Sequence, residues 1–264
     1  MKVGEGWCSS SKFRENLFVQ FQVFLPMSQP EKVLVLCAAG KVGSNVCIAL
    51  KEAGFEVYGT TRSSGCCLES KGIHPVIRNC TVREDLDCAF VESGAKKVVV
   101  ITDYFKAAKC KAAVEIQQGK DAIDAAKAAC VSHLIYVSVA DADLDHNVQH
   151  FRTKLAVEEC LKSSGLRFSV LRPTVFFENI DTSSVLREGR IRYAITTRVT
   201  FCSTYDIGRA AAIMFKNPHR WLGKKLDVVS WAGELGEVAA ALEKVRGEEF
   251  RAFMWIMCKL GGPY

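Results

Sequence analysis

Three side chains of the 264-residue chain could hold a charged ligand or move a proton. His150 and Lys154 are four residues apart, so they share one face if their segment is helical. An imidazole transfers protons near neutral pH, and a neighbouring ammonium group can assist an acid or bind an anion. Arg62 carries a forked guanidinium that suits phosphate. These residue types predict a site for an anionic ligand, with acid–base chemistry as a separate question.

The segment that would build such a site is residues 33–43, VLVLCAAGKVG. It predicts a buried strand and a turn with Gly40 and Gly43, followed by a helix that ends near Gly54. The first turn of a helix presents unpaired N–H groups to phosphate. The dinucleotide-binding fingerprint has three glycines, and Cys37 stands at the first of these positions. The loop therefore predicts a nucleotide site, with plain packing of a strand on a helix as the alternative.

Strands and helices alternate along the rest of the chain. The strands are predicted from residue 33 and at 55–59, 73–77, 97–102, 133–138, 167–172 and 225–229, and the helices at 41–54, 85–92, 111–130, 148–164, 206–215 and 235–245. This order predicts an α/β fold, a Rossmann-type doubly wound parallel sheet with a smaller C-terminal α/β lobe. We expect a poorly ordered extension at 1–27, an NADP-binding domain at 28–173 and the smaller lobe at 174–264, which ends in an incomplete element.

The residue type after the second strand indicates which dinucleotide binds. Parallel strands bring their carboxyl ends to one rim of the sheet. An acid after the second strand binds the ribose of NAD, whereas a cation at that position binds the extra phosphate of NADP. Thr60 and Thr61 precede Arg62 at this position, and there is no acid. The sequence predicts NADP(H) as the cofactor, with an ordinary surface arginine as the alternative.

Composition excludes several classes of protein. The net charge of +6 comes without a block of like charges, so we expect no direct nucleic-acid binding. No apolar run is long enough for a membrane span, and no targeting signal is evident, so the cytoplasm is the expected compartment, with nuclear entry left open. The twelve cysteines include no C-x-x-C pair, which predicts no metal site. We expect most of them to be buried thiols in a reducing compartment.

Six ordered blocks of the chain resemble the NmrA-like family, atypical members of the short-chain dehydrogenase/reductase superfamily, and especially its NADPH sensors. The blocks are AAGKVGSNV at 38–46, TTR at 60–62, VVVITDYF at 98–105, QGKDAIDAAKAACVSHLIYVS at 118–138, HFRTKLAVEECLKSSGLRFSVLRPTVFFENI at 150–180 and YDIGRAAAIMFKNP at 205–218. The sequence departs from the family at two positions. Cys37 replaces the usual first glycine, and Cys66 stands where the sensors have a lysine, which puts the loop shape and the NADP selectivity in doubt.

The resemblance implies cofactor contacts along the whole rim. It implies a pyrophosphate loop, a 2′-phosphate contact, an adenine region, a ribose and nicotinamide region and a cover over the nicotinamide. In that order the residues are Ala38, Ala39, Gly40, Lys41, Val42 and Gly43; Arg62; Asn79 and Cys80; Thr102, Asp103, Tyr104 and Lys154; and Phe176, Phe177, Glu178 and Asn179.

Two functions stay open at this point. Tyrosine-dependent reductases of the superfamily have a tyrosine four residues before the lysine, whereas this chain has His150 before Lys154. The missing tyrosine favours a redox sensor that binds NADP(H) and changes its conformation or its protein partner. The intact rim, with Phe176 and Phe177, favours an NADPH-dependent reductase of quinones, enones or similar planar molecules, in which Lys154 and His150 would be catalytic. The substrate, the partner and the oligomeric state do not follow from the sequence.

Overall fold

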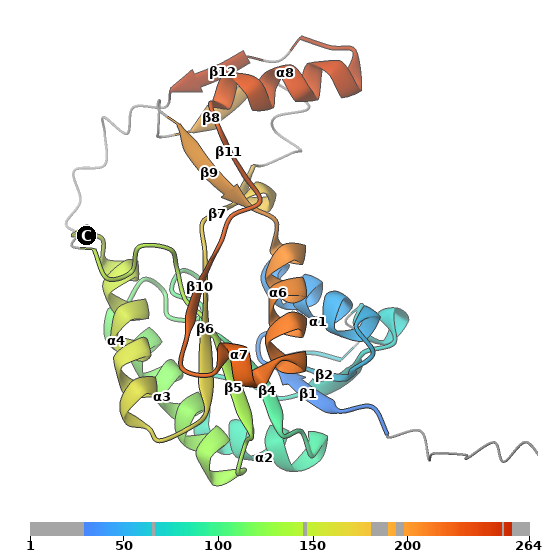
Figure 1. Cartoon of the computed structure of the whole chain (residues 1–264), viewed down its shortest axis with the longest axis vertical. Helices are drawn as coiled ribbons and strands as arrows, with labels where there is room; N and C mark the ends of the chain where they lie inside the picture. Colours follow the sequence, from blue (N-terminus) through green and yellow to red (C-terminus); the bar gives the residue numbers. More distant parts are fainter. Residues whose placement is uncertain are drawn as a thin grey trace, which may run out of the picture.

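The computed structural model describes residues 29–64, 67–144, 147–180, 190–193, 198–249 and 251–254. Its main feature is a seven-stranded parallel sheet in the order β10-β6-β5-β4-β1-β2-β3 (Figure 1). The strands are β1 (Lys32–Val35), β2 (Glu56–Thr61), β3 (His74–Ile77), β4 (Lys97–Ile101), β5 (His133–Val137), β6 (Phe168–Pro173) and β10 (Lys225–Val228). The predicted extension at 1–27 and Cys66 lie outside the described residues.

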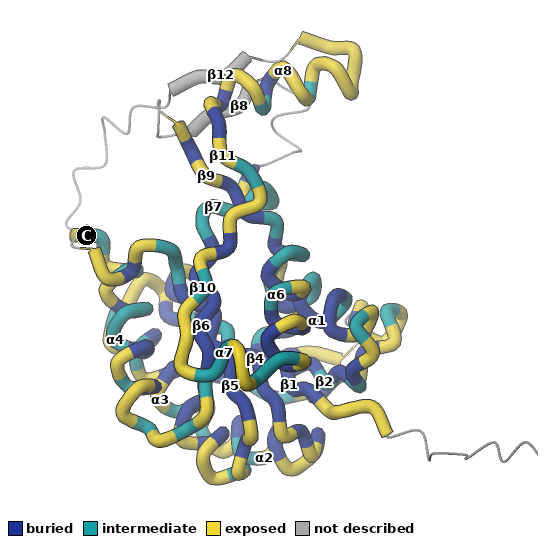
Figure 2. Tube along the Cα trace, in the orientation of Figure 1, coloured by how far each residue is buried: buried dark blue, intermediate teal, exposed yellow. Residues whose placement is uncertain are grey.

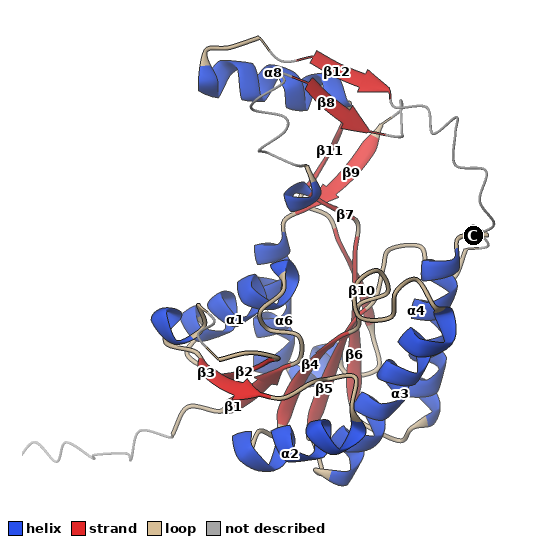
Figure 3. Cartoon of the chain, turned by 180° about the vertical axis from the view of Figure 1, so that it is seen from behind, coloured by secondary structure: helices blue, strands red, loops and turns tan. Residues whose placement is uncertain are grey.

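Helices cover both faces of this sheet (Figure 3). Side chains of β1 alternate between two clusters, because successive residues of a strand point to opposite faces. Val33 and Val35 pack in the cluster that contains the buried residues of α1 and α6, whereas Leu34 packs in the cluster that contains those of α2 and α3. The helices are α1 (Lys41–Glu52), α2 (Arg83–Ser93), α3 (Ala112–Ala128), α4 (Gln149–Ser163), α6 (Thr204–Lys216) and the short α7 (Pro218–Trp221). The doubly wound Rossmann-type prediction is confirmed.

A smaller unit stands beyond the carboxyl ends of the strands (Figure 1). It contains a three-stranded sheet in the order β11-β9-β7, a two-stranded sheet and one long helix. Its elements are β7 (Val175–Phe176), the 3-10 helix η2 (Phe177–Asn179), β8 (Arg190–Tyr193), β9 (Val199–Cys202), β11 (Trp231–Gly233), α8 (Leu235–Arg246) and β12 (Arg251–Met254). A second 3-10 helix, η1 (Glu69–Lys71), connects β2 to β3.

Two elements of the C-terminal part of the sequence lie on the larger unit. Strand β10 pairs in parallel with β6, with Lys225 opposite Val170, and α6 packs on α1. The chain therefore leaves the main sheet after β6, builds part of the smaller unit and returns. The boundary that we expected after Pro173 has elements of the larger unit on both sides.

Buried positions follow the strands of the main sheet (Figure 2), but the cysteines are less buried than we expected. Among those that the structure describes, Cys47, Cys80 and Cys202 are buried. Four others are exposed, namely Cys67, Cys88, Cys110 and Cys130. The prediction that most cysteines are buried was therefore wrong, because Cys110 and Cys130 lie in the turns that flank α3, where both adopt a positive φ, and not inside the helix.

Candidate functional site

The loop between β1 and α1 is a tight turn at the centre of the rim. The N–H of Cys37 donates to Thr60 Oγ1 at 2.9 Å, and the N–H of Gly40 donates back to Cys37 O at 3.0 Å. Cys37 has φ +56°, a left-handed conformation that favours glycine. A Cβ on Gly43 would lie 2.3 Å from Cys37 O, so only glycine lets α1 approach this loop.

The unpaired backbone N–H groups of this turn, within the described residues, indicate a phosphate site. The N–H of Ala38 is not among them, because it already donates to Thr60 O at 3.0 Å and the residue is fully buried. The N–H groups of Ala39, Lys41 and Val42 have no hydrogen-bond acceptor within the described parts of the chain. They lie at the positive end of the α1 dipole, where anions bind favourably.

Arg62 lies directly after β2 and is exposed. It has neither an ion pair nor a hydrogen bond with any residue of the described segments, so its guanidinium is available to a ligand. Along the rim, Asn79 is used locally: its Oδ1 accepts hydrogen bonds from the N–H and the hydroxyl of Thr81, at 3.2 and 2.9 Å. The next residue, Cys80, is buried.

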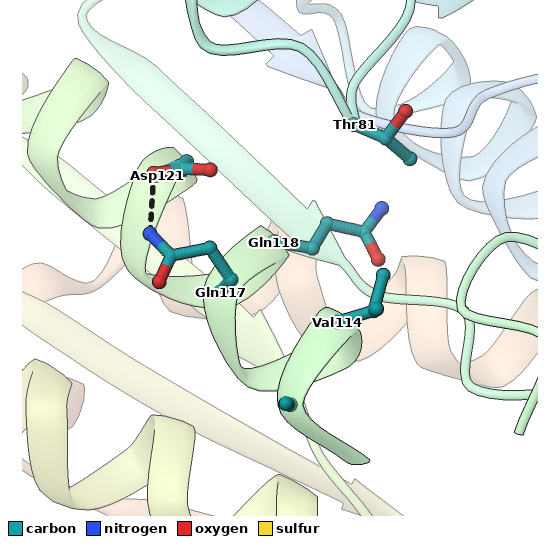
Figure 4. A pocket seen from close by; sticks show the side chains of 6 residues that line it. Thr81, Val114, Gln117, Gln118 and Asp121 are labelled. Atoms are coloured by element: carbon teal, nitrogen blue, oxygen red, sulfur yellow. Dashed lines mark hydrogen bonds between the residues drawn. The ribbon is translucent and has the colours of Figure 1, made fainter. Parts of the chain in front are cut away.

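A cavity of about 260 Å³ is lined by Thr81, the residue that follows Cys80 in the sequence, and by α3 (Figure 4). Its lining comes from the loop after β3 and from the first half of α3, namely Thr81, Ala113, Val114, Gln117, Gln118 and Asp121. Gln118 is only 5% exposed. Its Oε1 accepts the N–H of Asp103 at 3.3 Å, whereas its Nε2 has no partner within the described residues. The cavity therefore offers a buried donor that a ligand could satisfy.

Lys154 is held by a buried carboxylate. Its Nζ lies 2.9 Å from Oε1 of Glu115, which is completely buried. The same Nζ donates to Oγ1 and to O of Thr102, at 2.7 and 3.2 Å. Glu115 also accepts hydrogen bonds from the hydroxyls of Thr102, at 2.8 Å, and of Thr153. The ammonium group is thus paired and fixed at the end of β4.

The packing of α3 on α4 brings these groups together. A Cβ on Gly119 would lie 2.5 Å from Val157 Cγ2, so the glycine lets the two helices approach closely. One turn earlier on each helix, Glu115 meets Thr153 and Lys154. Glu115 was not predicted as a site residue, because an acid near a helix start is typical of a solvated first turn. The available signal was its position one turn before Gly119, on the buried face of α3.

His150 belongs to an aromatic cluster at the start of α4. Its ring centroid lies 5.9 Å from that of Tyr104, 5.4 Å from Phe105 and 4.7 Å from Phe151. Burial lowers the pKa of His150 below its ordinary value of 6.5, although Glu115 acts in the opposite direction. The imidazole is therefore neutral at neutral pH and accepts a proton poorly there.

Neither Tyr136 nor Tyr104 takes the place of the missing acid. The Nζ of Lys154 lies 5.7 Å from the ring centroid of Tyr136, but Tyr136 is only 1% exposed and its hydroxyl lies 3.2 Å from Thr102 Oγ1. Burial raises the pKa of Tyr136 far above its ordinary value. The hydroxyl of Tyr104 donates to Gln149 Oε1 at 2.9 Å. Both hydroxyls are thus occupied inside the protein.

The segment 176–179 is tied to the larger unit. Lys41 Nζ donates to the backbone oxygen of Glu178 at 2.8 Å, which connects the predicted phosphate loop to η2. The Glu178 carboxylate accepts the N–H and the hydroxyl of Thr204, at 3.0 and 2.7 Å, and so caps α6. Phe177 stacks on Phe201 with centroids 4.9 Å apart. Phe176 packs partly against the main core, and Asn179 is exposed.

The predicted residues thus fall into two groups. The glycine loop, Arg62, Asp103, Lys154 and the His150 cluster follow the carboxyl ends of successive strands, whereas the side chains of Phe177 and Glu178 are engaged in internal contacts. Within the described segments, no group of three or more His, Cys, Asp or Glu side chains could hold a metal ion. None of the helices described there is long and apolar enough to cross a bilayer.

Several solved structures have a similar fold. Triphenylmethane reductase of Citrobacter sp., complexed with NADP(H), is 19% identical with a TM-score of 0.70, over 84% of this chain and 78% of that one. The NADPH-dependent quinone oxidoreductase of Escherichia coli, complexed with NADPH, is 22% identical with a TM-score of 0.68, over 84% and 77%. A mutant form of NmrA is 21% identical with a TM-score of 0.67, over 85% and 74%. At these identities the likeness establishes the fold.

Sequence comparison places the chain in a family. No curated protein matches it significantly. The family model of the NmrA-like family, by contrast, matches residues 29–254, which include all the strands and helices described above. The chain therefore belongs to the NmrA-like family.

Proposed function

We propose that this protein binds NADP(H) on the rim and acts as a redox sensor. The pyrophosphate would lie on the N–H groups of Ala39, Lys41 and Val42, and the 2′-phosphate on Arg62. The adenine would enter the cavity lined by Gln118, whose Nε2 has no hydrogen-bond partner among the described residues. Gly43 supports this fit, because a Cβ there would clash with the backbone of the loop and prevent its close approach to α1. Two structures with a similar fold were solved with this cofactor bound.

The observation that carries the sensor role is the buried Glu115–Lys154 pair. In a tyrosine-dependent reductase the lysine charge assists a tyrosine hydroxyl. Here the charge of Lys154 is compensated by Glu115 at 2.9 Å, and His150 stands at the position of the tyrosine. Because burial keeps His150 neutral, it supplies little acid at neutral pH. The arrangement favours binding and conformational response over proton transfer.

A reductase is the second candidate, and one observation favours it. Tyr104, Phe105 and His150 gather beside Lys154, and Phe105 is 63% exposed. The exposed ring of Phe105 at the nicotinamide end of the rim could stack on a flat substrate. Triphenylmethane dyes and quinones, named for two structures of similar fold, are aromatic or planar molecules. The cofactor would supply the hydride in this case.

Titration of the purified protein with NADPH and with NADH tests the cofactor. We expect NADPH to bind more tightly than NADH. The substitution Arg62→Ala should weaken NADPH binding by about tenfold with little effect on NADH binding, because one charge-assisted phosphate contact is lost. Arg167→Ala is the matched control, since Arg167 is also exposed but precedes β6, at the opposite end of the strands. An unchanged preference in Arg62→Ala would contradict the assignment.

The two functions separate in a turnover assay. If the protein is a sensor, we expect NADPH to stay reduced when it is mixed with the protein and a panel of quinones, enones and triarylmethane dyes. Steady consumption of NADPH with any of these, abolished in Lys154→Met without loss of NADPH binding, would establish the reductase instead.

A further inference from the structure

Two thiols meet beneath the predicted phosphate loop. Thr60, a buried residue of β2, contacts both cysteines. Its Oγ1 accepts a hydrogen bond from the N–H of Cys37 at 2.9 Å and lies 2.9 Å from Sγ of Cys80. The backbone of Cys37 and the sulfur of Cys80 are therefore within two hydrogen-bond lengths of each other. The two thiols are also close enough for each to shift the pKa of the other. Residues from the ends of β1 and β3 thus form one dithiol.

The two thiols are not equivalent. The hydrogen bond from Cys37 lowers the pKa of Cys80 against the effect of burial, whereas the pKa of Cys37 is raised by Cys80, by burial and by Asp103, with Lys154 acting in the opposite direction. One thiol of the pair thus loses its proton more easily and is the better nucleophile. The other stands next to it as the resolving thiol. Cys37 is half-buried, which opens the pair to a small oxidant.

We propose that Cys37 and Cys80 are a reversible modification site, in which a hydroperoxide oxidises the two thiols to a disulfide that restrains the phosphate loop. The Cys80 thiolate attacks a peroxide oxygen, which gives a sulfenic acid and, from hydrogen peroxide, one water. The thiol of Cys37 then attacks the sulfenic sulfur, and the hydroxyl group leaves as a second water. Two thiols lose two electrons, and one peroxide gains them.

The bond would act on the loop through the position of Cys37. This residue has φ +56°, donates to Thr60 and accepts from Gly40, so its backbone sets the course of the turn. A disulfide requires its own spacing and dihedral angle, so Cys37 must move towards Cys80. The N–H groups of Ala39 and Lys41 move with it. This second half of the inference rests on the proposed NADP(H) site.

Peptide mapping tests the disulfide without reference to any cofactor. The protein is treated with hydrogen peroxide, alkylated and digested with trypsin, which releases Cys37 in peptide 33–41 and Cys80 in peptide 79–83, each with a single cysteine. We expect the linked pair of peptides, and its loss after treatment with dithiothreitol. Cys37→Ser and Cys80→Ser should each abolish it, and Cys88→Ser, an exposed cysteine of α2, should leave it unchanged. A disulfide between other cysteines, or oxidation of Cys80 to a sulfinic acid without a link, would overturn the proposal.

NADPH titration of the same samples tests the control of the loop. The disulfide should weaken NADPH by about tenfold, the effect of one lost charge-assisted hydrogen bond, and reduction should restore the affinity. Bound NADPH should in turn lower the fraction of disulfide at equilibrium in a thiol–disulfide buffer, because the coupling is reciprocal. Equal affinity of the disulfide and reduced forms for NADPH would overturn the proposed effect of the disulfide on the phosphate loop. If the reduced protein binds no NADPH at all, the proposed function fails, while the peptide map still decides whether the dithiol exists.

Discussion

At the scale of single residues, the decisive feature is a charge that has no contact with water. Glu115 is 0% exposed, and an ionised carboxylate is tolerated there only because each of its oxygens is paired. Oε1 lies against Lys154 and Thr102, and Oε2 accepts the hydroxyl of Thr153. Such a pair adds little net stability compared with apolar residues, but removing one member leaves the other charge uncompensated.

The pair should therefore show strong energetic coupling. We expect Glu115→Gln to lower the free energy of unfolding by about 3 kcal/mol, because the Lys154 ammonium loses its counter-charge. The double variant Glu115→Gln/Lys154→Met should recover at least about 1 kcal/mol of this loss. Urea unfolding of the single and double variants measures both values. Glu159→Gln, which breaks the exposed Lys162–Glu159 pair, is the control and should change stability by less than about 0.5 kcal/mol. Additive effects of the two buried substitutions would contradict the coupling.

At the scale of elements, the approach of α1 to the end of β1 depends on one missing side chain. Gly43 faces the carbonyl of Cys37 and the Cα of Ala38, at 2.3 and 2.7 Å from where its Cβ would be. Both neighbours are backbone atoms, which cannot rotate away. The loop and the helix must therefore separate if any larger residue is placed there, and the N–H groups of Lys41 and Val42 would change direction.

We expect Gly43→Ala to cost about 1–3 kcal/mol of stability, as in other overpacked sites. The same change should weaken NADPH by about tenfold or more through the displaced donors. Gly236→Ala is the matched control, because Gly236 lies in α8 with no atom within 4 Å of the added Cβ. In that helix alanine should be neutral or stabilise by up to about 1 kcal/mol. Thermal unfolding and NADPH titration of both variants provide the comparison; equal behaviour would show that the loop adapts.

The elements themselves follow from the sequence, because the spacing of apolar residues reports which face of a segment is buried. That is why α3 was predicted at 111–130 and is found at Ala112–Ala128. Partners of an element are a different matter. The residues of β10 indicate a strand, but nothing in them indicates that β6 is its neighbour. The engagement of Glu178 with α6 was missed for the same reason, since Thr204 is distant in sequence.

At the scale of the whole molecule, one polar network binds the returning chain to the main sheet. Glu158 of α4 is completely buried and accepts hydrogen bonds from Arg172 Nε and Nη2, at 3.0 and 2.9 Å. It also accepts the hydroxyl of Ser138 at 2.6 Å and lies 3.0 Å from Lys225 Nζ. One carboxylate thus joins the carboxyl ends of β5 and β6 and the start of β10 to α4. Strand β10 follows β7 and β9 in the sequence. The contact with Glu158 therefore holds the returning chain in place beside β6.

We expect Glu158→Gln to lower the free energy of unfolding by about 3 kcal/mol at pH 7, because Arg172 and Lys225 keep their charges beside a neutral group. Burial raises the pKa of Glu158, but hydrogen bonds from Arg172, Ser138 and Lys225 outweigh it, so the pKa lies below its ordinary value of 4.5. The stabilisation is therefore present above pH 4.5 and is lost as the pH falls through the lower folded pKa.

Urea unfolding at several pH values measures this difference directly. The gap between the native protein and Glu158→Gln should be constant near neutral pH and should narrow as the pH falls through the lowered pKa of Glu158, where the native carboxylate also becomes protonated. Asp143→Asn is the control, because Asp143 bonds the same Arg172 at 2.8 Å but is about half exposed, and it should cost less than about 1 kcal/mol. Hydrogen exchange of the β10 amides should quicken in Glu158→Gln and not in Asp143→Asn. A gap that persists undiminished in acid would mean that the shape of the Glu158 side chain, and not its charge, holds β10 against β6.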